Sequence, residues 1–246
     1  MDPFADLGPV VPAMPPQEFL DLSAEQNIAF DPGDLERLGT FVALLLAANE
    51  RVNLTAIREA ERVWVRHILD SLTLMAFLAE LDEGAARVID VGSGGGLPAL
   101  PLAIAMGSLD FTLLEATGKK AAFLRLAIER LSLPNARVVC GRAEQIGQQR
   151  EQRERYDAAM ARALGPTRVA AELTIPLIHP GGVVLLIKGE RAEQELIDAK
   201  HALRTLHATH ERTHITPSGR VVVLTKRGAT PRLYPRRDGE PKRNPL

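Results

Sequence analysis

The fold is decided by one stretch, Arg87–Pro101, which reads Arg-Val-Ile-Asp-Val-Gly-Ser-Gly-Gly-Gly-Leu-Pro-Ala-Leu-Pro. Val88–Val91 is apolar apart from one acid and predicts a short buried strand. The strand runs into a glycine-rich turn, Gly92–Gly96, and then into the apolar helical pattern of Leu97–Ile104. A strand, a glycine turn and a helix in this order present backbone N–H groups at a helix start, which a carboxylate or phosphate can approach closely.

The spacing of these glycines distinguishes two classes of cofactor site. The dinucleotide fingerprint G-x-G-x-x-G requires a glycine where this chain has Leu97. The pattern present is Asp90-x-Gly92-x-Gly94-x-Gly96, which resembles the first motif of class I S-adenosylmethionine (SAM) methyltransferases. A carboxylate at Asp90 could accept hydrogen bonds from the ammonium group of SAM, directly or through water. The alternative is a glycine-rich connector that binds nothing.

Composition limits the classes of function. The 246 residues carry a formal net charge of −1, so nucleic-acid binding would need a local basic patch. Cys140 is the only cysteine, which excludes an internal disulfide and fits a reducing compartment. His207, His210 and His214 straddle a predicted helix end and strand, so we expect no metal site. No apolar run approaches the ~18 residues of a membrane helix, and no signal peptide is evident. We expect a cytoplasmic monomer with no membrane association.

Four regions are expected along the chain: a proline-rich, disordered tail (1–16), a helical N-terminal extension (17–84, closed by Gly84), a core of alternating strands and helices (85–226) and a basic C-terminal tail (227–246). The helical patterns of the extension fall at 17–28, 33–49, 59–67 and 69–81.

Strand and helix patterns alternate through the core. Strands are expected at 88–91, 110–114, 136–140, 157–161 and 183–187, followed by a hairpin of strands near 208–214 and 220–225. The helices between them are expected at 97–106, 118–131, a short one from Ala143, 167–178 and 190–206. Repeated strand–helix units predict an α/β, Rossmann-like fold, with a mainly parallel seven-stranded sheet and helices on both faces.

Residues that follow parallel strands meet at one edge of the sheet, so they are the candidates for a cofactor site. Glu115 ends the second strand, and its two oxygens could bind the vicinal hydroxyls of a ribose. A surface ion pair with Lys119 is the alternative. Ala143 and Glu144 follow the third strand and could meet the adenine edge of the cofactor. A local ion pair between Arg142 and Glu144 is the alternative there.

Arg162 follows the fourth strand, where methyltransferases commonly place a substrate-facing group. The (Asp/Asn)-Pro-Pro-(Tyr/Phe) motif of exocyclic-amine methyltransferases is missing there. Cys140, the one possible nucleophile for C5-pyrimidine chemistry, is expected in the core of the third strand. Methylation of guanine N7 requires neither this motif nor a cysteine nucleophile, because N7 has an exposed lone pair. Arg162 could then hold the cofactor carboxylate or guanine O6, and a surface salt bridge is the alternative.

Other basic residues could contact RNA. Lys188 closes the fifth strand and could meet a phosphate, or cap a helix at the surface. His67 could contact RNA, or form an ordinary exposed pair with Asp70 on the same helical face. In the C-terminal tail, Arg236–Arg237 could bind phosphates while Tyr234 stacks on a base. The alternative for this tail is a solvated, partly disordered end.

Together these residues resemble one family, the bacterial small-subunit ribosomal RNA guanine-N7 methyltransferases known as GidB or RsmG. The resemblance runs from about Asn53 to the C-terminus. It rests on Asn53-Leu54-Thr55, Arg66-His67-Ile68-Leu69-Asp70-Ser71, Asp90–Pro98, Gly118-Lys119-Lys120 with Phe123-Leu124, Arg142-Ala143-Glu144, Arg162-Ala163, Lys188-Gly189 and Tyr234-Pro235-Arg236-Arg237. The chain departs from the family pattern at Ala48 and Ala99, where tryptophan and glycine are usual.

The resemblance implies a class I methyltransferase core, SAM as methyl donor and 16S rRNA of the small ribosomal subunit as substrate. It also implies cofactor contacts from Gly92, Leu97, Ala143, Glu144 and Arg162. With the residues derived above, the expected cofactor-binding set is Asp90, Gly92, Gly94, Gly96, Leu97, Glu115, Ala143, Glu144 and Arg162. The expected mechanism needs no general base and depends on positioning, with Arg162 as the catalytic residue. A SAM-binding RNA factor without turnover, an NAD-dependent dehydrogenase and a methyltransferase for another substrate are the alternatives.

Overall fold

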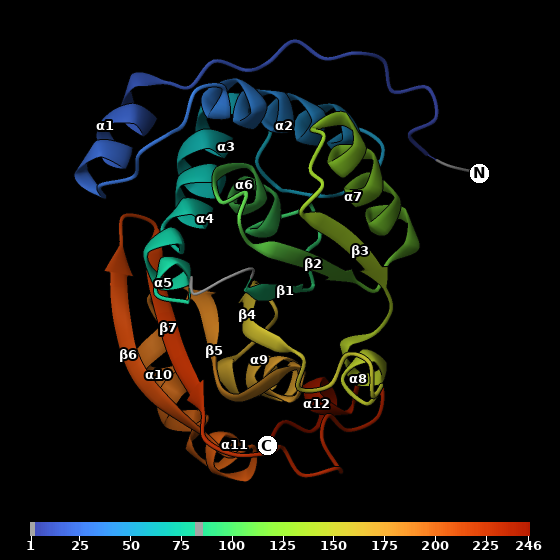
Figure 1. Cartoon of the computed structure of the whole chain (residues 1–246), viewed down its shortest axis with the longest axis vertical. Coiled ribbons are helices and arrows are strands. Elements are labelled where there is room, and N and C mark those ends of the chain that lie inside the picture. Colours follow the sequence, from blue (N-terminus) through green and yellow to red (C-terminus); the bar gives the residue numbers. More distant parts are fainter. Residues whose placement is uncertain (1–2, 82–85) are drawn as a thin grey trace.

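A seven-stranded sheet lies at the centre of the protein, whose computed structural model describes residues 3–81 and 86–246 (Figure 1). The expected boundary at Gly84 lies outside the described residues. The strands are β1 (Arg87–Val91), β2 (Asp110–Glu115), β3 (Ala136–Cys140), β4 (Tyr156–Arg162), β5 (Ile178–Lys188), β6 (Ala208–Thr216) and β7 (Gly219–Lys226).

The order of the strands across the sheet is β3-β2-β1-β4-β5-β7-β6. Neighbours from β3 to β5 are parallel, and β7 runs antiparallel to both β5 and β6. The predicted Rossmann-like class is confirmed, including the hairpin at its end. The direction of the strand order reverses between β1 and β4, so the carboxyl ends of these two strands flank the crevice in which such folds bind ligands.

Helices cover both faces of the sheet (Figure 1). They are α1 (Gln17–Glu25), α2 (Asp34–Asn49), α3 (Ala60–Val63), the π-helical turn η1 (Trp64–Leu69), α4 (Asp70–Leu72), α5 (Met75–Ala79), α6 (Ala99–Ala105), α7 (Gly118–Arg130), α8 (Ala143–Ile146), α9 (Thr167–Thr174), the 3₁₀ turn η2 (Ile175–Leu177), α10 (Ala192–Asp198), α11 (Lys200–Thr205) and α12 (Glu240–Arg243). Val88 belongs to a core shared with α2, α6 and α7, and its neighbour Ile89 to a second core shared with α9 and α11. This alternation follows from the two-residue period of a strand.

Two boundaries differ from the prediction for local reasons. The helix expected at 167–178 ends at Thr174 and becomes 3₁₀, because Pro176 has no N–H to donate to the helix. The strand expected at 183–187 begins at Ile178. It continues through Gly181, which has φ +93°, and Gly182, where a Cβ would lie 2.7 Å from the Asp157 carbonyl oxygen. The two glycines therefore allow β5 to begin before Pro180 and to continue through it.

The residues before β1 are packed through aromatic side chains. Phe19 and Trp64 are fully buried, with ring centroids 4.7 Å apart. Residues 3–16 contain no helix or strand, yet they differ from the disorder expected of them. Phe4 is 2% exposed and meets Phe123 of α7 edge-to-face at 5.8 Å. The apolar side chains among the prolines thus hold this segment against α7.

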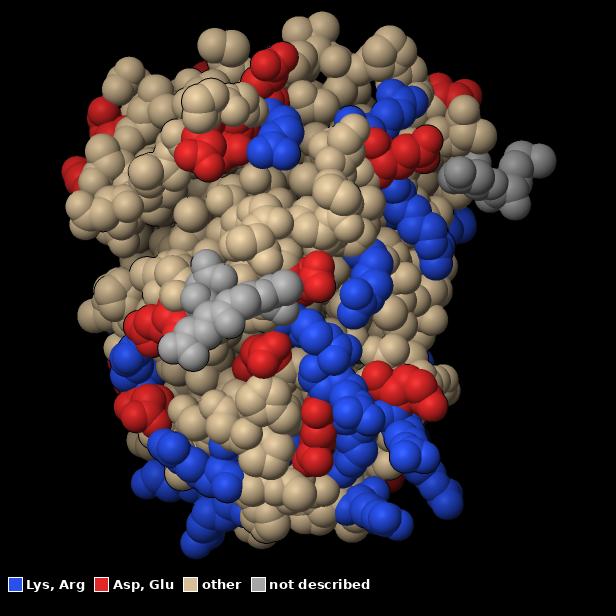
Figure 2. Space-filling view, in the orientation of Figure 1, with Lys and Arg blue, Asp and Glu red and all other residues tan. Residues whose placement is uncertain are grey.

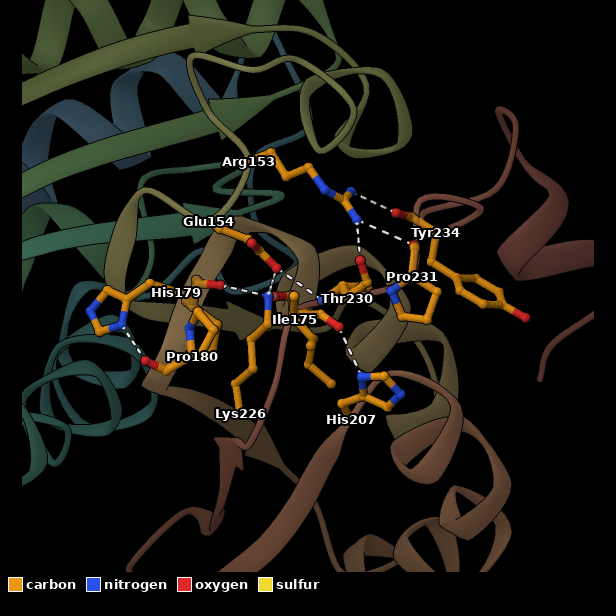
Figure 3. Close-up of polar contacts among 12 residues, drawn as sticks. Arg153, Glu154, Ile175, His179, Pro180, His207, Lys226, Thr230, Pro231 and Tyr234 are labelled. Atoms are coloured by element: carbon orange, nitrogen blue, oxygen red, sulfur yellow. Dashed lines mark hydrogen bonds and ion pairs between the residues drawn. The ribbon is translucent and has the colours of Figure 1, made fainter.

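The segment that follows β7 is docked on the core by hydrogen bonds (Figure 3). Lys226 is buried, and its Nζ donates to Glu154 Oε1 at 2.7 Å and to the carbonyl oxygens of Ile175 and Ile178. Arg153 donates to main-chain carbonyl oxygens of the tail, those of Thr230, Pro231 and Tyr234. The basic composition of this segment does not by itself distinguish an arm that binds phosphates from a solvated, partly disordered end.

Charge is distributed unevenly over the surface. On the face in Figure 2, Lys and Arg gather in the lower half, over the part of the molecule that carries β6, β7 and the C-terminal segment. A net charge of −1 therefore coexists with local basic areas. Among residues 3–81 and 86–246, no helix is both long and apolar enough to cross a membrane. The same residues hold no group of three or more His, Cys, Asp or Glu side chains placed to bind a metal ion.

Candidate functional site

The glycine turn after β1 is shaped by close packing on one side and is open on the other. Gly92, Gly94 and Gly96 have φ of +78°, +54° and +83°, which L side chains rarely adopt. A Cβ on Gly96 would lie 2.4 Å from Leu100 Cδ1, and one on Gly92 would lie 3.0 Å from Leu164 Cδ1. At Gly94 the nearest atom would be a backbone oxygen 3.8 Å away. Gly94 therefore faces free space, where a ligand can approach the backbone.

Asp90 lies beneath this turn as a buried carboxyl group without a partner. It is 1% exposed, and neither of its oxygens has a hydrogen-bond partner among the described residues. Burial raises its pKa to about 7, and the nearby Ser93 hydroxyl and Ala99 N–H offset this only in part. Buried polar groups are normally bonded. An unpaired carboxylate here suits a cationic group such as an ammonium.

Glu115 joins the end of β2 to the glycine turn. Its Oε2 accepts from the Gly94 N–H at 2.9 Å and its Oε1 from the Thr117 N–H at 2.7 Å. The side chain is 7% exposed and makes no ion pair with Lys119, so the surface-pair alternative does not describe this residue. Each carboxylate oxygen has a second lone pair, which remains available to a ribose hydroxyl.

Glu144 lies across the same crevice and is held by the C-terminal segment. Its Oε1 accepts from Arg142 Nη2 at 2.6 Å and from the Gly239 N–H at 2.9 Å. Burial alone would raise the pKa of Glu144, but these hydrogen bonds lower it overall. A cavity of about 90 Å³ lies between Gly92, Glu115, Ala143, Glu144 and Leu164. The pattern had suggested an Arg142–Glu144 pair, but nothing in the sequence indicated the contact with Gly239.

Arg162 ends β4 and faces a second cavity, of about 310 Å³. Its Nη2 donates to His67 Nδ1 at 2.5 Å, and its Nη1 lies 3.5 Å from Asp70 Oδ2. Ala163, the next residue, has φ +55°. Ala163 lines the larger cavity and Leu164 the smaller one, so the two cavities lie on either side of this turn. The surface salt-bridge alternative does not fit, because the Arg162 side chain is only 21% exposed.

His67 supports Arg162 from the π-helical turn η1. Its ring is nearly buried, and burial together with the charge of Arg162 lowers its pKa to about 4. The Arg66 carbonyl oxygen also lies 3.0 Å from Nδ1, but a guanidinium can only donate, so Nδ1 carries no proton. Nε2–H then donates to Thr55 Oγ1 at 2.7 Å. Both ring nitrogens are committed inside the protein, so the geometry gives His67 a supporting role in place of the expected exposed pair or RNA contact.

Two other basic residues that were expected to contact RNA, Lys188 and Arg236, instead form hydrogen bonds and ion pairs within the protein. Lys188 Nζ donates to the Gly165 carbonyl oxygen at 2.5 Å and to Glu195 Oε2 at 2.9 Å, and its side chain is 9% exposed. Arg236 makes a bidentate pair with the fully buried Glu172, with distances of 2.9 and 2.6 Å. The structure thus gives both a structural role. Lys188 fixes the turn after Arg162, and Arg236 fixes the C-terminal segment on α9.

The remaining expected site residues are placed as follows. Tyr234 is half-buried and Arg237 is exposed, so both remain accessible to RNA. Leu97 is nearly buried at the end of the glycine turn. Cys140 was expected in the core, but it is exposed because β3 is an edge strand of the sheet. Thr55, Asp70 and Ser218 were not expected as site residues. Asp70 was expected only as a possible surface partner of His67, and Thr55 and Asp70 both lie within segments on which the family resemblance rests.

Known structures share the architecture of this protein. A Klebsiella pneumoniae protein assigned as an O-methyltransferase aligns with a TM-score of 0.56 at 16% identity, covering 86% of this chain and 100% of that one. The cyclase SpnF aligns with a TM-score of 0.51 at 14% identity, over 82% of this chain and 98% of that one. The fold is that of class I methyltransferases, and its occurrence in a cyclase shows that the fold alone does not decide the reaction.

The family follows from sequence. The chain matches a family model, GidB, described as rRNA small subunit methyltransferase G, over residues 34–222. A Sorangium cellulosum protein named ribosomal RNA small subunit methyltransferase G is 45% identical over 92% of this chain and 94% of its own length. A protein of the same name from Leuconostoc citreum is 39% identical over 94% of this chain and 98% of its own. The chain belongs to the GidB family, and the expected resemblance is confirmed.

Proposed function

We propose that this protein transfers the methyl group of SAM to N7 of a guanine in 16S rRNA of the small ribosomal subunit. The observation that carries the proposal is the pair of cavities on either side of Ala163 and Leu164. One is lined by Gly92, at the start of the glycine turn, and by Glu115, and the other by Arg162. Membership of the GidB family supports ribosomal RNA as the substrate class. That substrate would locate the protein in the cytoplasm.

The residues of the glycine turn and of the smaller cavity beside it fit SAM. The unpartnered carboxyl group of Asp90 suits its ammonium group, and the open side of Gly94 leaves room for the ligand. Glu115 retains lone pairs for the ribose hydroxyls, and Ala143 and Glu144 would border the adenine. SAM supplies a methyl group on a positively charged sulfur. We also propose that the protein works as a monomer.

The chain has to position the base more than activate it. The N7 lone pair of guanine forms the new bond to the methyl carbon, the sulfur keeps the electron pair of the broken bond, and no proton leaves N7. A general base is therefore not needed. The larger cavity is lined by the charged side chains of Arg66, Asp70, Arg162 and Lys188 and by the neutral ring of His67. Correct placement of two reactants can supply on the order of 7–11 kcal/mol. Arg162 would donate to guanine O6 and hold the base.

The direct test is methyl transfer from labelled SAM into small ribosomal subunits that lack this modification, followed by mapping of the methylated purines in the rRNA. We expect one N7-methylated guanine. A folded protein that binds SAM but transfers nothing would instead be a non-catalytic RNA factor. A protein that binds NAD and ignores SAM in calorimetric titration would belong with the dehydrogenases.

A further inference from the structure

The cavity beside Arg162 contains a hydrogen-bond donor and an acceptor that are both unused. Arg162 Nη1 is buried and has no hydrogen-bond partner among the described residues. Asp70 Oδ2 lies 3.5 Å from it, which is too long for a hydrogen bond. The second terminal nitrogen of Arg162 and the second carboxylate oxygen of Asp70 already form hydrogen bonds. Arg162 Nη2 donates to His67, and Asp70 Oδ1 accepts from the hydroxyl of Ser218.

The environment of this pair indicates a planar, uncharged ligand. The Arg162 and Asp70 side chains are 21% and 7% exposed, so neither is freely solvated. Apolar walls are provided by Ile57, Ala163 and Ile187. The charges of Arg162 and Asp70 balance each other, so a neutral ligand can bond to both side chains. Arg66, which is exposed, is a further cation in the lining of the cavity. A ligand that satisfies both side chains must present an acceptor to Arg162 and, directly beside it, a donor to Asp70.

We propose that Asp70 is the residue that reads the target base: its Oδ2 accepts the N1–H of guanine while Arg162 Nη1 donates to O6. The proposal rests on the guanine-N7 methylation proposed above. Guanine carries the O6 acceptor next to the N1–H donor, whereas adenine carries an amine donor next to the N1 acceptor. An adenine in this cavity would place two donors together at Arg162 and two acceptors together at Asp70. Sites built to bond a polar edge reject a mismatched one by about 10⁴-fold or more.

This way of reading the base leaves the reacting atom free. Contacts at O6 and N1 hold the Watson–Crick edge of guanine and make no demand on N7, which must reach the methyl group. Ser218, in the turn between β6 and β7, fixes the carboxylate of Asp70 through its hydroxyl. Ser218 is therefore a positioning residue for Asp70. Recognition of an unstacked base by its Watson–Crick edge is the common mode for RNA-binding proteins.

The test uses small ribosomal subunits assembled with rRNA in which the target nucleotide is guanine, inosine or 1-methylguanine. All three bases keep O6 and N7. Inosine also keeps the N1–H, whereas 1-methylguanine replaces it with a methyl group. For the wild-type protein we expect kcat/KM on inosine within about 10-fold of guanine, and on 1-methylguanine at least about 100-fold lower. Equal methylation of guanine and 1-methylguanine by the wild-type protein would overturn the role of Asp70 without any variant.

The matched variant is Asp70→Ala, with Asp21→Ala on the exposed face of α1 as the control. Removal of the Asp70 carboxylate deletes the acceptor and opens space for the added methyl group. The ratio of kcat/KM for guanine to that for 1-methylguanine should fall to within about 10-fold, while Asp21→Ala keeps the wild-type ratio. Comparing ratios between proteins cancels any effect of the modified base on subunit assembly.

A merely structural role of Asp70, as a support for Arg162, predicts a different result. All three bases would then lose activity by the same factor, and the ratio would stay at its wild-type value, which overturns the proposal. SAM binding by Asp70→Ala, measured by calorimetry, verifies that the variant is folded. If the wild-type protein leaves guanine itself unmethylated, the proposed function fails, and this outcome is distinct because it needs neither the variant nor the altered bases.

Discussion

Arg162 is the expected catalytic residue, and the packing around it holds its side chain in place. Its guanidinium is held by the neutral ring of His67 and lies beside Asp70, and one of its nitrogens remains unbonded toward the cavity. A preorganised donor of this kind contributes mainly by holding the substrate in the reacting geometry.

Substitution of this residue tests that role directly. Arg162→Ala removes the donor for O6, so we expect kcat/KM for RNA methylation to fall by about 10²-fold or more, with SAM affinity within a few-fold of wild type. Methylation in purified small subunits and calorimetry with SAM measure the two quantities. Arg125→Ala, at an exposed position of α7, is the control and should cost far less. Unchanged methylation by Arg162→Ala would remove the residue from the mechanism.

Asp90 illustrates a conflict between stability and binding. Its folded-state pKa of about 7 lies above the 3.8 of an unperturbed aspartate, so the folded state binds more protons than the unfolded state between these pH values. The stability that this proton affinity gives is complete below about pH 4 and is lost as the pH rises through 7.

We therefore expect Asp90→Asn to raise the stability of the SAM-free protein at pH 8 by on the order of 1–3 kcal/mol, and to do so less at pH 5. The same change should weaken SAM binding, because the partner of the ammonium group is lost. Denaturant unfolding at the two pH values, with and without SAM, measures both effects. A variant that is less stable at pH 8 and binds SAM as well as the wild type would contradict this account.

His67 should make the protein sensitive to acid. Its pKa falls from 6.5 to about 4 on folding, so the unfolded state binds the extra proton first and stability is lost as the pH drops from about 6.5 toward 4. The loss amounts to at most about 3 kcal/mol. His67→Gln should flatten the stability profile over this range, whereas His201→Gln at an exposed position serves as the control. Parallel profiles for the wild type and His67→Gln would show that His67 is not buried neutral.

Individual site residues could be predicted only where a short stretch of sequence indicated their position. The glycine spacing indicated Asp90 and Gly94 because strand, turn and helix are consecutive in the sequence. Arg162 could be inferred from the edge at which parallel strands end. Ser218 could not, since its partner Asp70 lies 148 positions away and only the completed sheet brings them together. The pairing of Arg236 with Glu172, 64 positions earlier, was missed for the same reason. Lys188 pairs with Glu195 only 7 positions away, but no pattern in the sequence indicated that the two side chains meet.

At the scale of elements, the C-terminal segment changes most between expectation and structure. Composition indicated a basic tail at 227–246. In the structure this segment, which we call the strap, packs on α9 and reaches Glu144. Arg236 anchors it on Glu172, and the Gly239 N–H bonds to Glu144. Charge counts cannot distinguish these outcomes, because the acid that receives Arg236 lies 64 residues earlier. The strands and the hairpin, which depend on short-range patterns, were predicted well.

Removal of one partner of this anchor should loosen the strap. Glu172→Gln leaves the nearly buried Arg236 without its counter-charge, so we expect a loss of about 3–5 kcal/mol in the free energy of unfolding. SAM affinity should fall as well, because the strap carries the Gly239 N–H that holds Glu144. Arg212→Ala breaks the exposed pair with Glu80 and should cost at most about 1 kcal/mol.

Thermal unfolding and calorimetry with SAM give these two values for each variant. If Glu172→Gln lost stability but bound SAM normally, the strap would be a structural brace with no influence on the cofactor side.

At the scale of the whole molecule, the cavity beside Arg162 is assembled from three distant parts of the chain. The helical extension supplies His67 and Asp70, the end of the fourth strand supplies Arg162, and the hairpin of β6 and β7 supplies Ser218. The sheet alone would carry the glycine turn but not this cavity.

This arrangement has a consequence for biosynthesis. A ribosome makes a protein from its N-terminus onward, so Ser218 and the strap emerge after the glycine turn. A chain interrupted between them could fold its glycine turn, yet it would lack Ser218 and the completed pocket. Completion of the pocket is therefore a late event in the synthesis of this chain.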